Sequence, residues 1–342
     1  MPDAIAAPKI SVCVPTYNRA QLLQKCLASL LNQSVRDYEV IVADNCSMDG
    51  TPDIVGSFAD SRLRYHRHET NLGPFGNMNL LINEARGTYI CIAHDDDVYA
   101  PEFLQRESEM LDRNQNVGMV HCAVYEVDVD GARRQIVRAY PTTRVLPGKD
   151  EFVRYLEGHN VCCSSVMARA ALYRQNPFDP RFLSADFLMW MKFSLCADVA
   201  YVAEPLLDMR VHGDTVTSWL TPMRWHDEFM AILNEGFALG VRAHPSIAGE
   251  RETLFRRAGR AQGRRFLTAE LAAVARGDFE LARGYTAVLD KLRGIGMPGG
   301  YGLTARLLTN GVGRRVLRLL AGVRRSRARR LAQSFDMKAA RA

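Results

Sequence analysis

Short β-branched runs alternate with helix-length amphipathic stretches from residue 9 to about residue 122, and this alternation restricts the fold more than any other feature. The expected strands cover residues 10–14, 38–43, 63–68 and 89–93. The expected helices cover residues 20–33, 51–59, 77–85 and 101–113. Strands joined through helices pair in parallel with right-handed crossovers. The pattern therefore predicts an α/β fold with an open, mostly parallel sheet flanked by helices.

After residue 122 the pattern becomes mixed, and we expect this part to extend the same sheet. VDVDGARRQIV, residues 127–137, has the composition of a hairpin. The other expected elements are helices at 149–157 and 185–197, an apolar stretch at 161–168, and strands at 199–203 and 206–211.

The strand signal vanishes from about residue 221. Residues 250 to 294 have the pattern of two helices broken at Gly277, with Asp278 available to cap the second. We therefore expect a helical C-terminal region.

The composition, 47% hydrophobic and 24% charged over 342 residues, is typical of a soluble globular protein. We find neither a signal sequence nor an apolar run of about 18 residues, so we expect neither secretion nor a membrane span. The cysteines show no C-x-x-C spacing, so we expect reduced thiols in the cytoplasm and neither disulfides nor zinc. They stand at positions 13, 26, 46, 91, 122, 162, 163 and 196.

The net charge of +6 comes from the C-terminal tail, because residues 314–330 carry eight arginines and no acid. Apolar residues recur near helical spacing among these arginines, so residues 313–335 are predicted to form a basic amphipathic helix. Such a helix suits an anionic membrane surface. Packing on the rest of the protein with solvated arginines is the alternative.

Polar residues follow four of the expected strands. They are PTYNR (15–19), DNCSMDGT (44–51), ETNLGPFGN (69–77) and HDDD (94–97). Ligands of open α/β sheets bind beyond the carboxyl ends of the strands. We therefore expect these four segments to meet at one edge of the sheet.

Asp95, Asp96 and Asp97 cannot all point into a dry interior, because an unpaired buried charge is very costly. Carboxylate oxygens suit Mg²⁺ or Mn²⁺, which also binds phosphate oxygens of a substrate. A solvated acidic loop is the alternative. The chain contains neither G-x-G-x-x-G after its first strand nor G-x-x-x-x-G-K-[ST], so a nucleotide would be held differently.

Three segments carry a family resemblance: ISVCVPTYNRAQLLQKCLASLLNQS, YEVIVADNCSMDGT and NLGPFGNMNLLINEARGTYICIAHDDDVYAPEFL. In this order and spacing they resemble the inverting nucleotide-sugar glycosyltransferases of family 2, which have the Rossmann-like GT-A fold. The resemblance runs from about Lys9 to Thr217. It implies a catalytic domain at 1–220, with a nucleotide-sugar half at 9–122 and an acceptor half at 123–220. Residues 221–342 are then a helical extension.

The resemblance also implies a nucleotide-sugar pocket. Tyr17 offers a flat face, and Asp44 can accept a hydrogen bond from a base, with a preference for uridine; ordinary packing and an Asx turn are the alternatives. Met78 stands where the family usually has an arginine. The residues that the resemblance places in this pocket are Pro15, Thr16, Tyr17, Arg19, Asp44, Asn71, Gly73, Asn79 and Asp95.

The family's metal motif usually has an aspartate where this chain has His94. The resemblance makes Asp96 the metal ligand and Asp95 a ribose or water-mediated contact, with Asp97 giving local support. His212 is a further candidate ligand. An ordinary hydrogen-bonded histidine is the alternative for both histidines.

Asp186 matches the family's general base, although Ala185 replaces the glutamate that usually precedes it. An acidic residue that complements a helix N-terminus is the alternative.

The implied function is metal-dependent, inverting sugar transfer from a nucleoside-diphosphate sugar, which is predicted to be UDP-linked, to an acceptor hydroxyl. The cofactor is Mn²⁺ or Mg²⁺. We expect a glycan or lipid-linked acceptor in surface polysaccharide or glycolipid synthesis, no nucleic acid, and a place in the cytoplasm or on the inner face of the cell membrane. A catalytically silent nucleotide-binding homologue and a sugar-phosphate nucleotidyltransferase are the alternatives.

Overall fold

The computed structural model describes residues 7–158, 161–212 and 220–292. The chain divides into two compact units. Among the described residues, 7–158, 161–212 and 232–245 belong to the first unit, and 220–231 and 246–292 belong to the second. The predicted basic helix at 313–335 lies outside the described residues. Within the described ranges, no helix combines the length and apolarity needed to cross a membrane.

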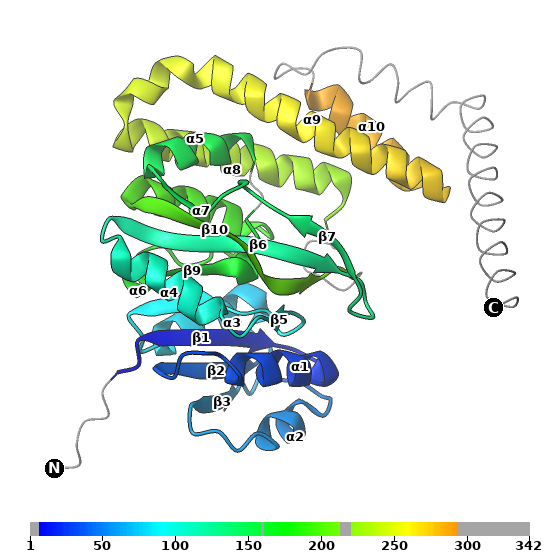
Figure 1. Ribbon diagram of the computed structural model, residues 1–342. Coiled ribbons are helices and arrows are strands. Elements are labelled where there is room, and N and C mark those ends of the chain that lie inside the picture. Colours follow the sequence, from blue (N-terminus) through cyan, green and yellow to red (C-terminus); the bar gives the residue numbers. More distant parts are fainter. Residues whose placement is uncertain (1–6, 159–160, 213–219, 293–342) are drawn as a thin grey trace, which may run out of the picture. The chain divides into compact units, whose positions relative to one another are not determined.

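A mixed, mostly parallel sheet forms the centre of the first unit, as the alternation predicts. Its strand order is β3-β2-β1-β4-β9-β6-β10-β5, while β7 pairs with β6 and β8 pairs with β10. The pairs β1–β2, β1–β4, β2–β3 and β6–β10 are parallel, and β1 to β3 lie side by side at the bottom of Figure 1. The strands are β1 Ile10–Thr16, β2 Tyr38–Asp44, β3 Leu63–Arg67, β4 Tyr89–Ile92, β5 Val98–Tyr99, β6 Val117–Val127, β7 Arg133–Val137, β8 Arg144–Leu146, β9 Val166–Arg169 and β10 Asp198–Arg210.

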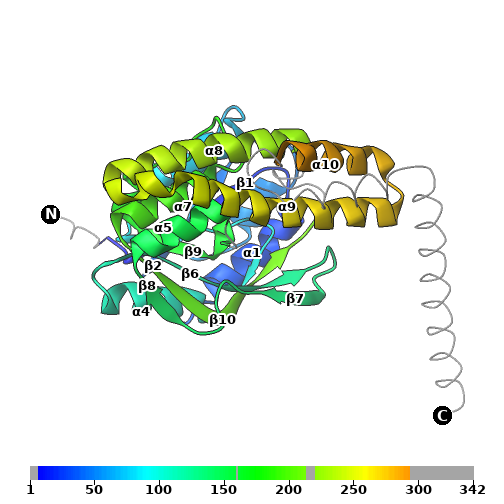
Figure 2. The ribbon, with the colours of Figure 1, turned by 90° about the horizontal axis from the view of Figure 1, so that it is seen from above.

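Helices cover both faces of the sheet. The core on one face joins α1, α2 and α4 to the inward side chains of the strands. On the other face α3, α6, α5 and α7 pack on the strands, and Figure 2 shows α5 and α7 side by side. The helices of this unit are α1 Ala20–Leu31, α2 Thr51–Gly56, α3 Gly73–Glu84, α4 Phe103–Arg113, α5 Gly148–Glu157, α6 Ala170–Gln175, α7 Ala185–Cys196 and the second half of α8 Pro222–Ala243.

The four strands and four helices expected before residue 122 are confirmed as β1 to β4 and α1 to α4, and the hairpin is confirmed as β6 and β7. Three details of the expectation were wrong. Helix α3 starts at Gly73 rather than at residue 77, because Pro74 suits a first helical turn. Helix α4 starts at Phe103, with Pro101 in the turn before it. The two strands expected around residues 199–211 are the single strand β10.

Pro205 explains the continuity of β10. A proline lacks the N–H group of a regular ladder, so it is tolerated in a strand at an irregularity. The register of β10 against β6 shifts on both sides of Pro205, and pairing then resumes up to Arg210. The strand bends without ending, and its carboxyl end reaches the same edge as that of β6.

The described part of the second unit is helical, as expected. It contains the first half of α8, α9 Arg251–Arg276 and α10 Phe279–Leu292. Gly277 ends α9 in the left-handed conformation, with φ of 84°. The Asp278 carboxylate accepts a hydrogen bond from the Leu281 N–H at 3.0 Å, so the predicted cap of α10 is confirmed.

Gly87 allows the turn between α3 and β4 to lie against β1. Its N–H donates to Ser11 Oγ at 2.8 Å, and a Cβ atom at Gly87 would lie 2.6 Å from Ser11 N and 2.8 Å from Tyr89 O. We expect Gly87→Ala to lower the free energy of unfolding by roughly 1–3 kcal/mol, because backbone atoms must move to admit the methyl group. Urea denaturation measures the effect.

Gly56→Ala is the matched control, because nothing lies within 4 Å of a Cβ atom at Gly56, the last residue of α2. It is expected to be neutral or to stabilise by up to about 1 kcal/mol. Equal unfolding midpoints for the two variants would show that the close approach at Gly87 does not matter.

Candidate functional site

Side chains from separate strands meet at the carboxyl edge of the sheet, around the loop that follows β4. Thr16, the last residue of β1, donates from Oγ1 to Asp95 Oδ2 at 2.7 Å. Arg19 Nη1 lies 3.1 Å from Asp95 Oδ1 and 2.8 Å from Asp96 Oδ2. The predicted meeting of residues 15–19 and 94–97 is therefore confirmed.

Asp96 receives further contacts from the end of β10. His212 Nε2 lies 2.9 Å from Asp96 Oδ2, and Arg210 Nε donates to the Asp96 carbonyl at 3.1 Å. Asp96 and His212, the two predicted metal ligands, are thus neighbours although 116 residues separate them.

Asp97 is engaged by backbone and side-chain donors. Its Oδ1 accepts from the Arg210 N–H at 2.9 Å, and its Oδ2 accepts from the Ser164 hydroxyl. Arg210 also donates through Nη1 to the carbonyls of Asp128 and Val129 in the β6–β7 turn. Arg210 therefore joins the aspartate loop to the hairpin.

The three carboxylates differ in acidity because their surroundings differ. Burial, followed by the negative charge of Asp96, raises the pKa of Asp95 and raises that of Asp97 to about 6. Burial alone would raise the pKa of Asp96, but His94, the hydrogen bond from His212 and the charge of Arg19 together lower it. Asp96 is the member of the cluster most readily ionised.

The cluster has the donor set of a divalent-cation site. One ligand atom each from His94, Asp96 and Asp97 lie within 4.8 Å of one another, and both aspartates are buried. Carboxylate oxygens with an imidazole nitrogen suit a divalent cation such as Mn²⁺. His94, which replaces the usual aspartate, belongs to this group.

Asp44 lies at the end of β2 and is fully buried. Its Oδ1 accepts from the Ser47 N–H at 2.8 Å, and its Oδ2 accepts from the Tyr65 hydroxyl at 2.6 Å. Arg67 Nε lies 3.6 Å from the same Oδ2. Burial and the hydrogen bond to Asp44 raise the pKa of Tyr65, so its hydroxyl keeps its proton. Asp44 is thus held in one orientation.

The loops around Asp44 are fastened to each other. Ser47 Oγ accepts from the Asn18 N–H at 2.9 Å, and Asn45 donates to Asn71 Oδ1 at the same distance. Asn71 Oδ1 also accepts from the N–H of Gly73, where φ is 72°. Such a φ favours glycine. Tyr17 lies on the first loop and is 46% exposed, whereas Pro15 lies in β1 just before it.

Asn79 lies on α3 and bonds to the loop that precedes α7. Its amide donates to the Phe178 carbonyl at 2.9 Å and accepts from the Phe178 N–H at 2.8 Å. In this structure the Asn79 side chain fastens that loop. A contact of Asn79 with a nucleotide stays a prediction.

Asp186 lies in the first turn of α7 and is half-buried. Burial raises its pKa to about 6, while the charge of His94 and the Phe187 N–H act in the opposite direction. His94, a member of the candidate metal group, thus acts on the pKa of Asp186. A carboxylate with this pKa can accept a proton near neutral pH.

Several residues of this edge were not among the predicted site residues. Arg210 stands two positions before His212, a predicted metal ligand, so the sequence places it close to a predicted site residue. The others are polar residues without a distinctive spacing: Asn45, Ser47, Tyr65, Arg67 and Ser164.

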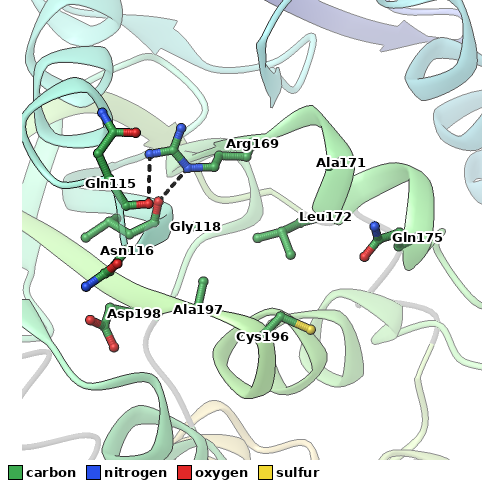
Figure 3. A pocket seen from close by; sticks show the side chains of 11 residues that line it. Gln115, Asn116, Gly118, Arg169, Ala171, Leu172, Gln175, Cys196, Ala197 and Asp198 are labelled. Carbon is green, nitrogen blue, oxygen red and sulfur yellow. Dashed lines mark hydrogen bonds between the residues drawn. The ribbon is translucent and has the colours of Figure 1, made fainter.

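A pocket lies at the opposite edge of the sheet, where β6 and β10 begin (Figure 3). Arg169 donates there to the backbone carbonyls of Val117 and Gln115. None of the residues expected to bind a ligand lines this pocket.

Residues 11–176 match the family model described as "Glycosyl transferase family 2". Among curated relatives, a Campylobacter jejuni protein named "GalNAc(5)-diNAcBac-PP-undecaprenol beta-1,3-glucosyltransferase" is 37% identical over 117 residues, which are 33% of this chain and 37% of the relative. The chain spans 31% to 64% of the length of the first curated relatives that it matches.

Two solved structures share the fold at 19% identity. One is S. aureus TarS 1-349 in complex with UDP-GlcNAc, with a TM-score of 0.57, covering 84% of this chain and 90% of that one. The other is the mannosyltransferase PcManGT from Pyrobaculum calidifontis in complex with GDP-Man and Mn²⁺, with a TM-score of 0.52, covering 94% and 88%.

The Tyr65 hydroxyl stabilises the buried Asp44 carboxylate. We expect Tyr65→Phe to lower the free energy of unfolding by about 1–3 kcal/mol, because it removes a hydrogen bond to a charged group. Urea denaturation measures this. Tyr17→Phe at an exposed position is the control, with an expected change below about 0.5 kcal/mol. If both variants unfold like the wild type, the hydroxyl does not support Asp44.

Proposed function

The chain belongs to glycosyl transferase family 2 through residues 11–176, and from this premise we propose that it is a metal-dependent, inverting glycosyltransferase. It moves a sugar from a nucleoside-diphosphate sugar to an acceptor hydroxyl. The observation that supports the proposal is that Asp96 belongs to a candidate metal group whose member His94 acts on the pKa of Asp186. Residues 1–220 form the catalytic domain, and residues 221–342 form the extension.

The donor nucleotide lies over the carboxyl ends of β1 and β2. The fixed carboxylate of Asp44 accepts from a ring N–H, which uracil and guanine both carry. We favour a uridine nucleotide, while the two structural neighbours are complexes with UDP-GlcNAc and with GDP-Man. The proposed contacts of the nucleotide sugar come from Pro15, Thr16, Tyr17, Arg19, Asp44, Asn71, Gly73, Asn79 and Asp95.

Asp96 and His212, which lie in hydrogen-bond contact, would hold the metal, Mn²⁺ or Mg²⁺. Asp96 also belongs to the candidate metal group with His94 and Asp97. A divalent cation supplies charge stabilisation to a departing nucleoside diphosphate. Asp97 is fastened by Ser164 and Arg210, which keeps the loop and therefore Asp96 in place.

Asp186 is the general base. Its carboxylate takes the proton from the acceptor hydroxyl as the oxygen attacks the anomeric carbon from the face opposite the leaving group. One displacement inverts the anomeric configuration, and no covalent enzyme intermediate forms. A folded-state pKa of about 6 keeps Asp186 ionised at neutral pH and still basic enough to accept the proton.

A catalytically silent, nucleotide-binding homologue is the second candidate. It is favoured by the departures from the family pattern at Met78, His94 and Ala185. Nucleotide binding without turnover on any acceptor would support it, whereas metal-dependent transfer would reject it.

The acceptor is proposed to be a glycan or a lipid-linked sugar in the synthesis of bacterial surface polysaccharide or glycolipid. The name of the C. jejuni relative includes an undecaprenol-linked acceptor. A lipid-linked acceptor would place the protein on the cytoplasmic face of the membrane, where the eight arginines of residues 314–330 suit anionic headgroups.

We expect Asp186→Asn to lower kcat by about 10²- to 10⁴-fold, because the amide cannot accept the proton of the acceptor hydroxyl. The rate is measured as the UDP that leaves the nucleotide sugar when the sugar is transferred. The affinity for UDP, measured by calorimetry, is expected to stay within about twofold of the wild-type value. A variant with wild-type kcat would remove Asp186 from the mechanism.

The pH profile provides a second readout. Asp186 is active when ionised, and its pKa is about 6. The wild-type kcat is therefore expected to fall about tenfold per pH unit below pH 6. The residual activity of Asp186→Asn should lack this limb. An identical acidic limb in both proteins would assign it to another group.

Deleting residues 313–342 tests the membrane part of the proposal. The truncated chain is expected to lose binding to vesicles that contain anionic lipid, and to keep its affinity for UDP. Sedimentation with vesicles of neutral and of mixed neutral and anionic lipid measures this. Unchanged sedimentation after the deletion would reject the tail as the membrane contact.

A further inference from the structure

Tyr65 and Arg67 lie at the surface on the base side of the site, and Asp44 is buried against them. The Asp44 side chain is 0% exposed, whereas Tyr65 is 37% exposed and the Arg67 side chain is 47% exposed. We propose that Tyr65 and Arg67 contact the nucleotide base directly and select a base that carries a ring N–H beside a carbonyl. The proposal rests on the proposed function, and it moves the contact with the base from Asp44 to the two exposed side chains that hold Asp44.

The pairing of β3 with β2 brings these side chains together. In this parallel pair Val42 lies opposite Tyr65, and Asp44 lies opposite Arg67. Alternate residues of a strand face the same side of a sheet, so Tyr65, Arg67 and Asp44 share one face. Strand β3 is the first in the strand order, and it lies beside β2 in Figure 1. The register of the sheet therefore places two exposed polar side chains next to the buried carboxylate.

The Tyr65 hydroxyl has a fixed polarity. It donates its proton to Asp44 Oδ2 at 2.6 Å, and Asp44 Oδ1 is held by the Ser47 N–H at 2.8 Å. Burial and the hydrogen bond to Asp44 raise the pKa of Tyr65, so the proton stays on the hydroxyl at neutral pH. The oxygen of a phenol that donates its proton still accepts a hydrogen bond. Tyr65 therefore presents an acceptor to a ligand.

Arg67 presents the complementary donor. Its Nη2 donates to the Ser47 carbonyl at 2.7 Å, and its Nε lies 3.6 Å from Asp44 Oδ2. A guanidinium carries five N–H donors in a planar fork, and those of Nη1 have no partner among residues 7–158, 161–212 and 220–292. Because Tyr65 and Arg67 both lie against Asp44 Oδ2, the free donors of the fork stand beside the Tyr65 hydroxyl. They are available to a carbonyl oxygen.

An acceptor beside a donor matches the edge of uracil, in which the N3–H group lies next to the O4 carbonyl. Guanine has the same order in its N1–H group and O6 carbonyl. Cytosine and adenine have the opposite order, with a ring nitrogen that accepts next to an amino group that donates. When the sugar and the diphosphate fix the base in one orientation, cytosine sets donor against donor and acceptor against acceptor. Such a mismatch leaves polar groups unpaired and lowers the affinity.

A direct contact of Asp44 with the base predicts a different response to mutation. If Tyr65 only supports Asp44, removing its hydroxyl frees Asp44 Oδ2 for the ring N–H, and the preference for uracil is kept or increases. If Tyr65 is itself the contact, the same change removes the acceptor that the base meets, and the preference is lost. Tyr65→Phe distinguishes the two cases, because the phenylalanine ring keeps the shape of the site.

The experiment measures the affinities of the full chain for UDP and CDP by calorimetry with Mn²⁺ present. The ratio of the two affinities cancels the contributions of the metal and the diphosphate. We expect the wild type to bind UDP at least about tenfold more tightly than CDP. In Tyr65→Phe and in Arg67→Gln this ratio is expected to fall to about one, because each variant loses a hydrogen bond to uracil and a mismatch with cytosine. GDP and ADP form the equivalent pair if the wild type favours purines.

Tyr89→Phe and Arg64→Gln are the matched controls. Tyr89 donates to Asp112 Oδ1 at 2.9 Å where β4 begins, so its variant removes a tyrosine–aspartate bond at the other end of the sheet. Arg64 lies on β3 and donates to Glu39 Oε2 at 2.9 Å, so its variant removes an arginine of the same strand. Both variants should keep the wild-type ratio of UDP and CDP affinities.

An unchanged or increased ratio in Tyr65→Phe would overturn the proposal and return the contact to Asp44. Equal affinities of the wild type within both nucleotide pairs would overturn it as well. If Tyr65→Phe does not fold, a wild-type ratio in Arg67→Gln decides against the proposal.

A failure of the proposed function gives a different result. If the wild type binds none of the four nucleotides with Mn²⁺, the nucleotide site and the assignment of its base contacts fall together. If the wild type binds them and the ratios do not respond to Tyr65→Phe and Arg67→Gln, only the assignment of the base contacts fails. Asp186 as the general base is still tested by its own variant.

Discussion

The need to neutralise three adjacent carboxylates at the end of β4 organises this edge of the protein. Buried charge is tolerated only when it is paired and hydrogen-bonded. The partners come from segments far apart in the chain: Thr16 and Arg19 after β1, Ser164 before β9, and Arg210 and His212 at the end of β10. Both halves of the first unit are therefore tied to the same short loop, and the position of each strand end matters for the site.

The strand order explains why two different groups of polar side chains adjoin each other. β1 lies between β2 and β4, so the chain leaves β1 in one direction and returns on its other side. This is the point at which open α/β sheets bind ligands. Asp44 follows β2 and is held by Tyr65 and Ser47, whereas the aspartate cluster follows β4. The proposed function assigns one side to a flat group that donates a hydrogen bond, and the other to a cation and the phosphates that accompany it.

Asp186 is carried by the first turn of α7 instead of by a strand end. The start of helix α7 is held in place because the loop before it is anchored by Asn79, which exchanges two hydrogen bonds with Phe178. The stacked rings of Phe75 and Phe178, 5.8 Å apart, add an apolar contact between α3 and the same loop. The helix that supports the nucleotide-side loop thus also places the proposed base. Asn79, which the resemblance gives as a contact of the nucleotide sugar, holds the loop before α7 in this structure. This structural role and the predicted contact would both depend on the position of α3.

The sequence by itself determined the elements and the edge at which they end. Local periodicity specifies strand and helix, and polar residues after parallel strands must gather at one edge, so the positions of Thr16, Asp44 and Asp96 could be anticipated. Only the tertiary structure decided which donor meets which carboxylate. Tyr65 against Asp44 and Arg19 against Asp95 and Asp96 depend on side-chain reach and loop course, which no periodicity encodes. The continuity of β10 through Pro205 was likewise decided by pairing with β6, because a ladder can resume after one irregularity.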